Sequence, residues 1–537
     1  MRQNSAISRL HSAFQQGEYP LFFLVCGLAC FGLLSLVSWI TFSEDDAHVM
    51  RVALESGWLS PYYDGQTYKQ LSAANFTPVV LTLFRLILNL FPFSEFSFLF
   101  ICLGLMAVAI SLSGLLVLKI SQSTAAAWLA MLLVFSNFAV ATMASRFYTL
   151  HYTAGGILAL LSLLLCLTPN FTPRRCLAIL MTASFAILAK EVYVVIPPLI
   201  FLGAWHYKSA GLAVAAAGTF VIYFTLRILV LGLPSGGGES SYLQSILLAD
   251  SFSWAGNFFT WYFKSKWLIV VVAILALFCA PQKMIRLLPV PLLFLLPTFL
   301  ASHAYLNPQL HGDRVFFAFD SALAIVAAVA LAPLLKALTL SVVKAYVAAF
   351  TLLAAVFFSH SMSAREYRRA ELGTTDYKVT KYLTDSGEKV VDQVYYVPLG
   401  FEQGQLAIVR RLLGLGTYLV TQNCILALEQ PADLLTVFDQ AGNISSRSAL
   451  EAGCMTVESP VTPLLLPRAV KGLVEWDLQV DSGFIGGVIF VDRAIAVPAP
   501  RFSTVMVSPP TGEPYQLFAF KGSQWWFSEI MQMEIQR

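Results

Sequence analysis

The sequence is short of charge. Only 12% of its 537 residues are Asp, Glu, Lys or Arg, whereas 57% are hydrophobic and the mean hydropathy is +0.70. A soluble globular protein has about 25% charged and roughly 45–50% apolar residues, so a chain of this composition cannot hide its apolar surface from water. Disorder is excluded for the same reason, because disordered chains are rich in charge. The composition indicates a polytopic membrane protein.

Several chemical signatures are also missing. The sequence holds no Cys-x-x-Cys motif, no cysteine–histidine cluster with zinc spacing, no short repeat and no low-complexity tract. Its 34 Lys and Arg residues are scattered and its net charge is only +3, so we expect no nucleic-acid partner. Of the eight cysteines, only Cys424 and Cys454 lie away from the apolar runs, and they either form a disulfide or remain free.

Long apolar runs fill the first two thirds of the chain. A bilayer core of about 30 Å needs roughly 20 apolar residues in a helix. The first run is too long for a removable signal peptide, so we expect it to remain as an anchor. By this measure we expect about eleven transmembrane helices, at 20–41, 96–118, 124–142, 152–168, 175–189, 192–206, 211–232, 262–280, 287–302, 315–334 and 338–358.

Basic residues are divided unevenly between the two sides of these helices. With the N-terminus in the cytosol, the inner segments are basic and Glu18 is their only acid, as the positive-inside rule requires. We therefore expect a cytosolic tail over 1–19 and a membrane domain over 20–360, with outer-face amphipathic helices at 43–95. An odd number of spans then places residues 361–537 in the periplasm of a bacterial inner-membrane protein.

Residues 361–537 have the composition of a soluble domain. Alternating segments separated by turn signals predict a mixed α/β, β-rich domain whose end, 466–537, is an antiparallel sandwich. Tyr515, Trp525 and Trp526 either stack on sugars or belong to the core or an edge of that sandwich.

Four polar clusters lie on the predicted outer side, where ionisable groups beside a membrane are costly and point to function. The first is Glu44-Asp45-Asp46, with His48 close by. Such carboxylates can accept a proton from an acceptor hydroxyl, or hold a divalent cation such as Mg²⁺ or Mn²⁺. The alternative is structural, because acids suit a helix start and apolar residues recur every four positions over 50–58, as in a membrane-surface helix.

The second and third clusters contain cations. Arg146 and His151 flank aromatic residues between two spans, where they either contact a phosphate and a sugar or anchor the chain at the interface. The adjacent pair Lys190-Glu191 interrupts an apolar stretch. Lys190 can bind a phosphate while Glu191 orients it or a substrate hydroxyl; the alternative is a structural ion pair at a helix break.

The fourth cluster, His311 and Arg314, opens the tenth span. A guanidinium beside free backbone N–H groups makes an anion site, although Arg314 can also serve only as an interfacial anchor. Together the clusters describe an outer pocket with carboxylates at one end and cations at the other. That is the chemistry needed to move a group off a phosphate, and in a membrane the natural donor is a lipid-linked phosphate.

The order of several motifs resembles that of the GT-C superfamily, the polytopic glycosyltransferases that use polyprenyl-phosphate sugars. These motifs are the acidic pair after the first span, Asn75-Phe76-Thr77-Pro78 with Arg85 after it, Lys190-Glu191 with Pro197 six residues later, and an arginine–aromatic start of a late helix at Arg314. The resemblance extends over most of residues 20–335. The superfamily includes the protein O-mannosyltransferases and the lipid A aminoarabinose transferases.

The resemblance implies a glycosyltransferase of the hexosyl or pentosyl class that builds a cell-envelope glycan or modifies a lipid or protein, with inversion at the sugar. It makes Asp45 and Asp46 the catalytic base and its partner, and also the cation ligands where a divalent metal is used. The residues expected to bind the donor phosphate or the substrate are Lys190, Glu191, Arg314, His311, Arg146, His151 and His48. The alternatives are a transporter or flippase for a lipid-linked saccharide, and a membrane-anchored sensor.

Overall fold

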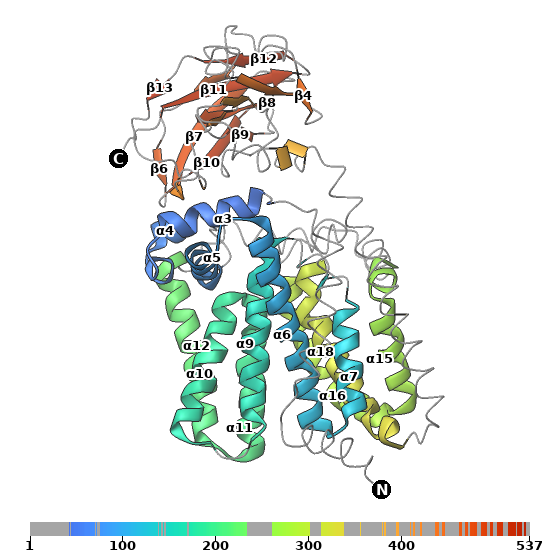
Figure 1. Ribbon diagram of the computed structural model, residues 1–537. Helices are drawn as coiled ribbons and strands as arrows, with labels where there is room; N and C mark the ends of the chain where they lie inside the picture. The colour runs from blue at the N-terminus through green and yellow to red at the C-terminus, as the bar shows by residue number, and fades with distance from the viewer. Residues whose placement is uncertain are drawn as a thin grey trace. The chain divides into compact units, whose positions relative to one another are not determined.

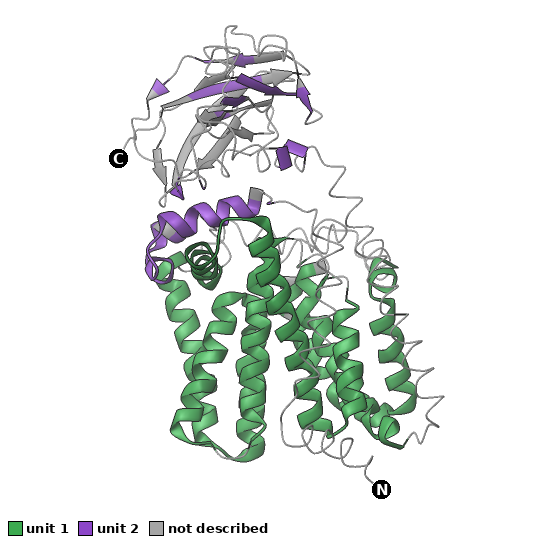
Figure 2. Cartoon of the chain, viewed as in Figure 1, with its two compact units in different colours: residues 1–40, 74–369 green, residues 41–73, 370–537 purple. Residues whose placement is uncertain are grey.

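The computed structural model divides the chain into two compact units (Figure 2). Unit 1 holds residues 1–40 and 74–369, and unit 2 holds residues 41–73 and 370–537. The structure describes residues 42, 44–69, 71, 76–137, 139–140, 143, 146–168, 171–232, 260–300, 313–337 and 355, and short stretches between 378 and 532. Each unit is described by itself.

Unit 1 is built of helices, several of which begin where the sequence supplies a capping residue. Ser94, Ser123 and Ser209 each accept a hydrogen bond from a backbone N–H of the first turn. The helices are α5 (Pro78–Leu90), α6 (Glu95–Ser121), α7 (Thr124–Phe135), η2 (Phe147–Thr149), α9 (Leu150–Cys166), α10 (Pro173–Ala189), η3 (Glu191–Val195), α11 (Ile196–Tyr207), α12 (Ala210–Leu231), α15 (Trp267–Cys279), α16 (Pro281–Leu287), α17 (Pro289–Leu300) and α18 (Asp313–Ala337) (Figure 1).

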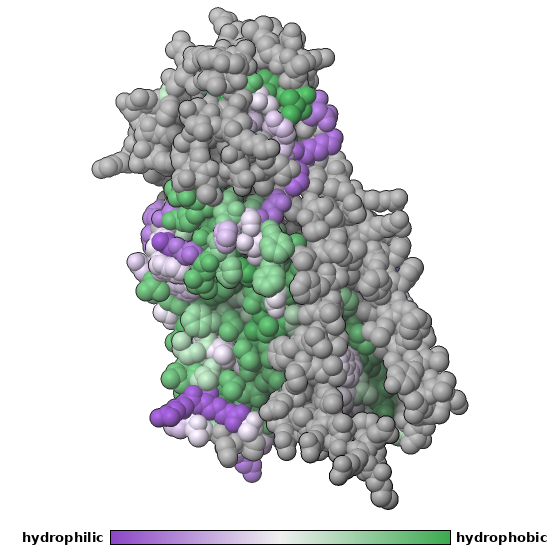
Figure 3. Space-filling view, in the orientation of Figure 1, coloured by the Kyte–Doolittle hydropathy of each residue, from purple (hydrophilic) through white to green (hydrophobic). Residues whose placement is uncertain are grey.

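The outer surface of unit 1 is apolar, as a helical multi-span membrane fold requires. Figure 3 shows apolar residues over much of the described helical surface in that view, and Trp205 and Phe278 are 81% and 78% exposed. Four of the described helices are long and apolar enough to cross a membrane, namely Glu95–Ser121, Phe147–Cys166, Ala210–Leu231 and Arg314–Ala337. The expected spans at 20–41 and 338–358 lie almost wholly outside the described residues, so the count of eleven stays a prediction.

Helix α18 lies at the centre of unit 1. It contacts α6, α7, α15, α16 and α17, and 89% of its apolar window is buried, against 28% for α12. Small side chains, Ala126 and Ala130 on α7 and Ala328 and Ala332 on α18, form one cluster with Val117. Such residues let helices approach closely inside a membrane, where packing replaces the hydrophobic effect between helices.

Unit 2 joins short helices to a β-rich part. Its helices are α3 (Glu44–Glu55), η1 (Ser60–Tyr62) and α4 (Gly65–Lys69). Because α3 ends at Glu55, Trp58 lies beyond it and is 44% exposed, so the apolar repeat over 50–58 does not form one continuous helix as expected. The turn at Ser60-Pro61-Tyr62 follows directly, and Pro61 favours the start of this new helical turn over continuation of the old one.

The strands of unit 2 form three sheets. In the first, β1 pairs in parallel with β2 and β3, and β4 is antiparallel to β3; the second (β10-β7-β5, with β6 on β7) and third (β12-β11-β8-β9, with β13 on β11) are antiparallel throughout. The strands are β1 (Val394–Tyr396), β2 (Leu419–Thr421), β3 (Leu435–Phe438), β4 (Ile444–Ser445), β5 (Val461–Pro463), β6 (Arg468–Val470), β7 (Leu473–Val480), β8 (Ile485–Phe490), β9 (Ala494–Val497), β10 (Phe502–Val507), β11 (Pro514–Lys521), β12 (Gln524–Phe527) and β13 (Met531–Gln532).

Two predictions for this part of the chain remain untested. Trp526 lies half-buried on β12, the edge strand of the third sheet, and its stacking on sugars stays a prediction. Cys424 and Cys454 lie outside the described residues, so their disulfide stays a prediction.

Candidate active site

Lys190 sits at a break between two helices. Helix α10 ends at Ala189, the backbone at Lys190 is extended, and η3 follows before Pro197 helps to start α11. The break turns Lys190 toward the start of α9, where its ammonium lies 4.8 Å from the centroid of the Tyr152 ring. Among the described residues no acid pairs with Lys190, so its charge remains available to an anion.

Arg314 contacts the same helix start from a distant segment of the sequence. It is in the first turn of α18, and its guanidinium lies 4.8 Å from the centroid of the Tyr148 ring in η2. Tyr148 and Tyr152 are four residues apart, so their side chains share a face. Two cations that are 124 residues apart in the sequence (190 to 314) therefore converge on one pair of rings. We call Lys190, Arg314, Tyr148 and Tyr152 the cation–tyrosine site.

His151 and Arg146 belong to this neighbourhood. The Nδ1 atom of His151 lies 2.5 Å from the Tyr148 carbonyl oxygen, and its ring centroid lies 4.7 Å from that of Tyr152. Arg146 precedes η2 and is half-buried. The structure thus brings the second, third and fourth predicted clusters together, represented by His151, Lys190 and Arg314.

Glu191 does not pair with its neighbour Lys190. Its Oε1 atom accepts hydrogen bonds from the Phe76 backbone N–H at 2.9 Å and from the Tyr223 hydroxyl at 2.8 Å, and it lies 3.5 Å from the Arg227 Nε atom. The carboxylate therefore joins the start of α5 and the end of α12 to η3. In this structure its contacts are those of a residue that positions the segment carrying Lys190.

An apolar pocket opens one turn beyond the cation–tyrosine site. Its cavity volume is about 90 Å³, and its lining includes Tyr193, Gly156 and Phe317. Tyr193 follows Lys190 by three residues, Gly156 follows Tyr152 by four, and Phe317 follows Arg314 by three, so each lies about one helical turn from a member of the site. Deeper in the pocket the walls are aliphatic and aromatic, with Leu160, Leu199, Phe294 and Ile325 among them.

The glycines of α9 are required by the close approach of η3. A Cβ atom on Gly155 would lie 2.5 Å from the Tyr193 ring, and one on Gly156 would lie 3.0 Å from the Tyr193 hydroxyl. That hydroxyl donates to the Tyr152 carbonyl oxygen at 2.7 Å. The pair of glycines therefore lets Tyr193 bridge the cation–tyrosine site and the pocket.

The predicted acidic residues belong to unit 2. Asp45 is exposed on α3, Asp46 is fully buried, and His48 is half-buried. His311 lies outside the described residues. Within the part of the chain that the structure describes, no group of three or more His, Cys, Asp or Glu side chains could hold a metal ion.

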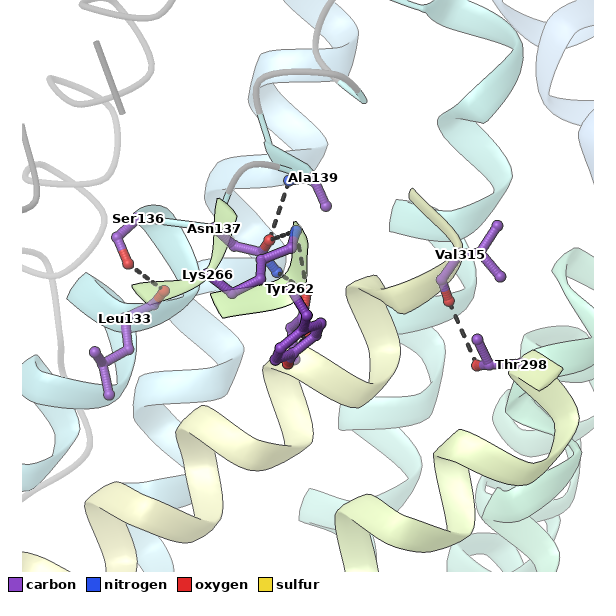
Figure 4. Close-up of polar contacts among 9 residues, drawn as sticks. Leu133, Ser136, Asn137, Ala139, Tyr262, Lys266, Thr298 and Val315 are labelled. Carbon is purple, nitrogen blue, oxygen red and sulfur yellow. Dashed lines mark hydrogen bonds and ion pairs between the residues drawn. The ribbon is translucent and has the colours of Figure 1, made fainter. Parts of the chain in front are cut away.

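Sequence reasoning missed a second charged group, which we call the α18 network: Asn137, Tyr262, Lys266 and Asp320. Figure 4 labels the first three. The Lys266 Nζ atom lies 3.2 Å from Asp320 Oδ2, and both side chains are 0% exposed. The signal was a single acid in the apolar run 315–334. Arg227, alone in the run 211–232, is a second example.

Comparison with known proteins adds a weak likeness of fold. No family model and no curated protein matches this sequence. Among solved structures, the chain is similar to ArnT from Cupriavidus metallidurans bound to undecaprenyl phosphate, with 13% identity, a TM-score of 0.41, and 75% of this chain and 86% of that chain covered. For ArnT in the apo state the identity is 14%, the TM-score is 0.39, and 76% and 86% are covered. At TM-scores below 0.5 these similarities do not identify the function of this chain, which is inferred from its own residues.

Proposed function

We propose that this chain is an integral-membrane glycosyltransferase that moves a hexosyl or pentosyl group from a polyprenyl-phosphate donor to an acceptor hydroxyl. The acceptor is a surface glycan, a lipid or a protein. The reaction takes place on the extracytoplasmic face of a bacterial inner membrane, with the N-terminus in the cytosol as the positive-inside rule predicts.

The observation that supports this proposal is the junction of the cation–tyrosine site with the apolar pocket. Lys190 and Arg314 supply two positive charges, and the wall that continues from them is apolar. A polyprenyl phosphate has the matching chemistry, with an anionic head and a long hydrocarbon chain. A soluble sugar phosphate would not fill the apolar pocket, and an ordinary apolar lipid would bring no anionic group to Lys190.

The residues then divide the reaction between them. Asp45, the exposed member of the acidic pair, accepts the proton of the acceptor hydroxyl, with the buried Asp46 as its partner. The acceptor oxygen forms a bond to the anomeric carbon while the bond from that carbon to the phosphate oxygen breaks, and the electron pair leaves with the phosphate. Lys190 and Arg314 stabilise the charge that develops there. This single displacement inverts the sugar.

Sugar transfer by the purified full-length chain in lipid nanodiscs tests the proposal. The donors are undecaprenyl-phosphate-linked hexoses and pentoses with a radioactive sugar, and the acceptor is a membrane and envelope extract. We expect Lys190→Ala and Arg314→Ala each to lower kcat/KM about a hundredfold or more, as for loss of one charge-stabilising group. Asp45→Asn removes the base and should lower kcat by about 10²–10⁴-fold.

Arg174→Ala is the matched control. Arg174 is exposed in the first turn of α10, and Lys190 directly follows the last turn, so the two are about 24 Å apart along the helix. Its replacement removes one charge far from the site and should leave transfer unchanged. Full activity of both cation variants, or movement of the lipid-linked sugar across the bilayer without transfer, would overturn the proposal.

A further inference from the structure

The α18 network is a set of buried polar contacts that the proposed reaction does not use. The Tyr262 hydroxyl donates to Asp320 Oδ1 at 2.6 Å, and the Asn137 side-chain amide donates to Asp320 Oδ2 at 3.0 Å. Lys266 Nζ donates to Asn137 Oδ1 at 2.5 Å, and the same oxygen accepts the Ala139 backbone N–H at 3.0 Å. Both carboxylate oxygens of Asp320 are thus engaged by groups from two other segments.

Stability alone gives no reason for such a group. Taking a lysine and an aspartate out of water costs several kcal/mol each, and apolar residues of similar volume often hold a fold equally well. The best-attested benefit of a buried ion pair is a unique arrangement, because only one registry satisfies all its partners. The position of Asp320 on α18 shows that the network can select one rotation of this helix about its axis.

Helix α18 presents two opposite faces. Arg314, Ala318, Ser321 and Ile325 follow one another at intervals of three or four residues, and the last three line the apolar pocket. Asp320 lies on the opposite face with Phe316, whose ring lies 6.2 Å from that of Tyr262. The helix is therefore held from the side that faces away from the pocket and Arg314.

We infer that the α18 network fixes the rotation of α18 about its axis, so that Arg314 stays over Tyr148 and the pocket keeps its lining. Its four members are positioning residues, since they act through Arg314 and touch no substrate. For the role of Arg314 this inference rests on the proposed function. Six residues of helix separate Arg314 from Asp320, about 9 Å of rise, so a small rotation at the network is carried directly to the guanidinium.

The double variant Lys266→Met/Asp320→Leu separates positioning from stability. It removes both charges together and keeps the site apolar and filled, so we expect a melting temperature close to that of the parent. The KM for the donor should nevertheless rise about ten- to a hundredfold, with a smaller change in kcat, because a misplaced binding group is costly. Tyr262→Phe is a milder second variant, for which we expect a two- to fivefold rise, about the value of one hydrogen bond.

A readout that needs no activity completes the test. Ser321→Cys is introduced on the pocket face of α18 in a chain whose eight native cysteines are replaced by alanine, and its alkylation by a maleimide is timed with and without the double variant. We expect the rate to change several-fold, since the cysteine leaves its place in the pocket wall. The inference is overturned if the double variant is stable and keeps the parental alkylation rate and donor KM. If the double variant does not fold, the same result with Tyr262→Phe overturns it. A wild-type chain without transfer overturns the proposed function instead, and the alkylation result still stands.

Discussion

Two groups of charged side chains each include one residue from the first turns of α18, and they differ in how their charges are paired. In the cation–tyrosine site, Lys190 and Arg314 lie against aromatic rings and Lys190 is only half-buried. In the α18 network, Lys266 and Asp320 are fully buried and each neutralises the other. In the first group Lys190 has no acid partner among the described residues, whereas in the second Lys266 and Asp320 pair with each other inside the protein.

This difference separates binding from positioning. A tyrosine ring attracts a cation by about 0.5–2 kcal/mol without cancelling its charge, so the Tyr152 ring can hold Lys190 in place while its charge stays available to an anion. A buried carboxylate such as Asp320 neutralises the charge of the lysine beside it and links the two segments that carry the pair. Variants in the two groups should therefore differ in what they change: ligand affinity in the first group, and stability or helix placement in the second.

The largest effect is expected when the buried pair is broken from one side. Lys266→Met alone leaves Asp320 charged, buried and without its cation, which should lower the free energy of unfolding by about 3–5 kcal/mol. Thermal unfolding in detergent measures this. Lys264→Met is the control, because Lys264 is exposed two residues earlier. An equal loss in both variants would show that the pair has no special place in the fold.

A smaller effect is expected where η3 presses against α9. Gly155→Ala places a methyl group 2.5 Å from the Tyr193 ring, so the ring and η3 must move, and we expect a loss of about 1–3 kcal/mol in unfolding free energy. The shift should also raise the donor KM, because Lys190 starts this segment. Gly104→Ala is the matched control, since a methyl group there meets no atom within 4 Å and alanine favours a helix. A harmless Gly155→Ala would contradict the close approach.

The sequence predicts a feature of these two groups when one short segment carries all the information for that feature. The apolar runs at 96–118 and 211–232 become α6 and α12 because membrane length and hydropathy are properties of one segment. The Lys190-Glu191 pair is conspicuous for the same reason, since two adjacent charges in an apolar stretch need an explanation. Arg314, at the start of its own run, could be found in the same way.

The partners of these residues could not be predicted, because they come from distant segments. Asn137 and Asp320 are 183 residues apart, and Glu191 meets Phe76 across 115 residues. The sequence near Lys190 does not show that its ammonium lies over the Tyr152 ring. Nor does it show that Glu191 accepts a hydrogen bond from the Phe76 backbone N–H instead of pairing with Lys190. A single aspartate inside an apolar span, Asp320, predicts that a buried partner exists, but it does not predict which residue that partner is.

The rings of the cation–tyrosine site should contribute to affinity and little to stability. Tyr152→Leu removes the surface on which Lys190 lies, and we expect undecaprenyl phosphate to bind more weakly by about 0.5–2 kcal/mol. Tyr152→Phe keeps the ring and serves as the control. Binding is measured by titration in nanodiscs, with undecaprenol as the ligand that lacks the phosphate. Equal weakening for both ligands would mean that the ring acts on the hydrocarbon chain and not through Lys190.

The smallest effect tests whether Glu191 resembles the α18 network or the cation–tyrosine site. Tyr223→Phe deletes the hydroxyl that donates to Glu191 at 2.8 Å but leaves the Phe76 N–H and Arg227 as partners. Because two partners remain, we expect a loss of only about 0.5–1.5 kcal/mol in unfolding free energy. Tyr207→Phe, on a partly exposed tyrosine of α11, is the control. If Glu191 only positions η3, the donor KM should rise in step with this loss and kcat should stay the same. A fall in kcat with stability unchanged would instead place Glu191 in contact with the substrate, and it would then belong with the ligand-binding charges.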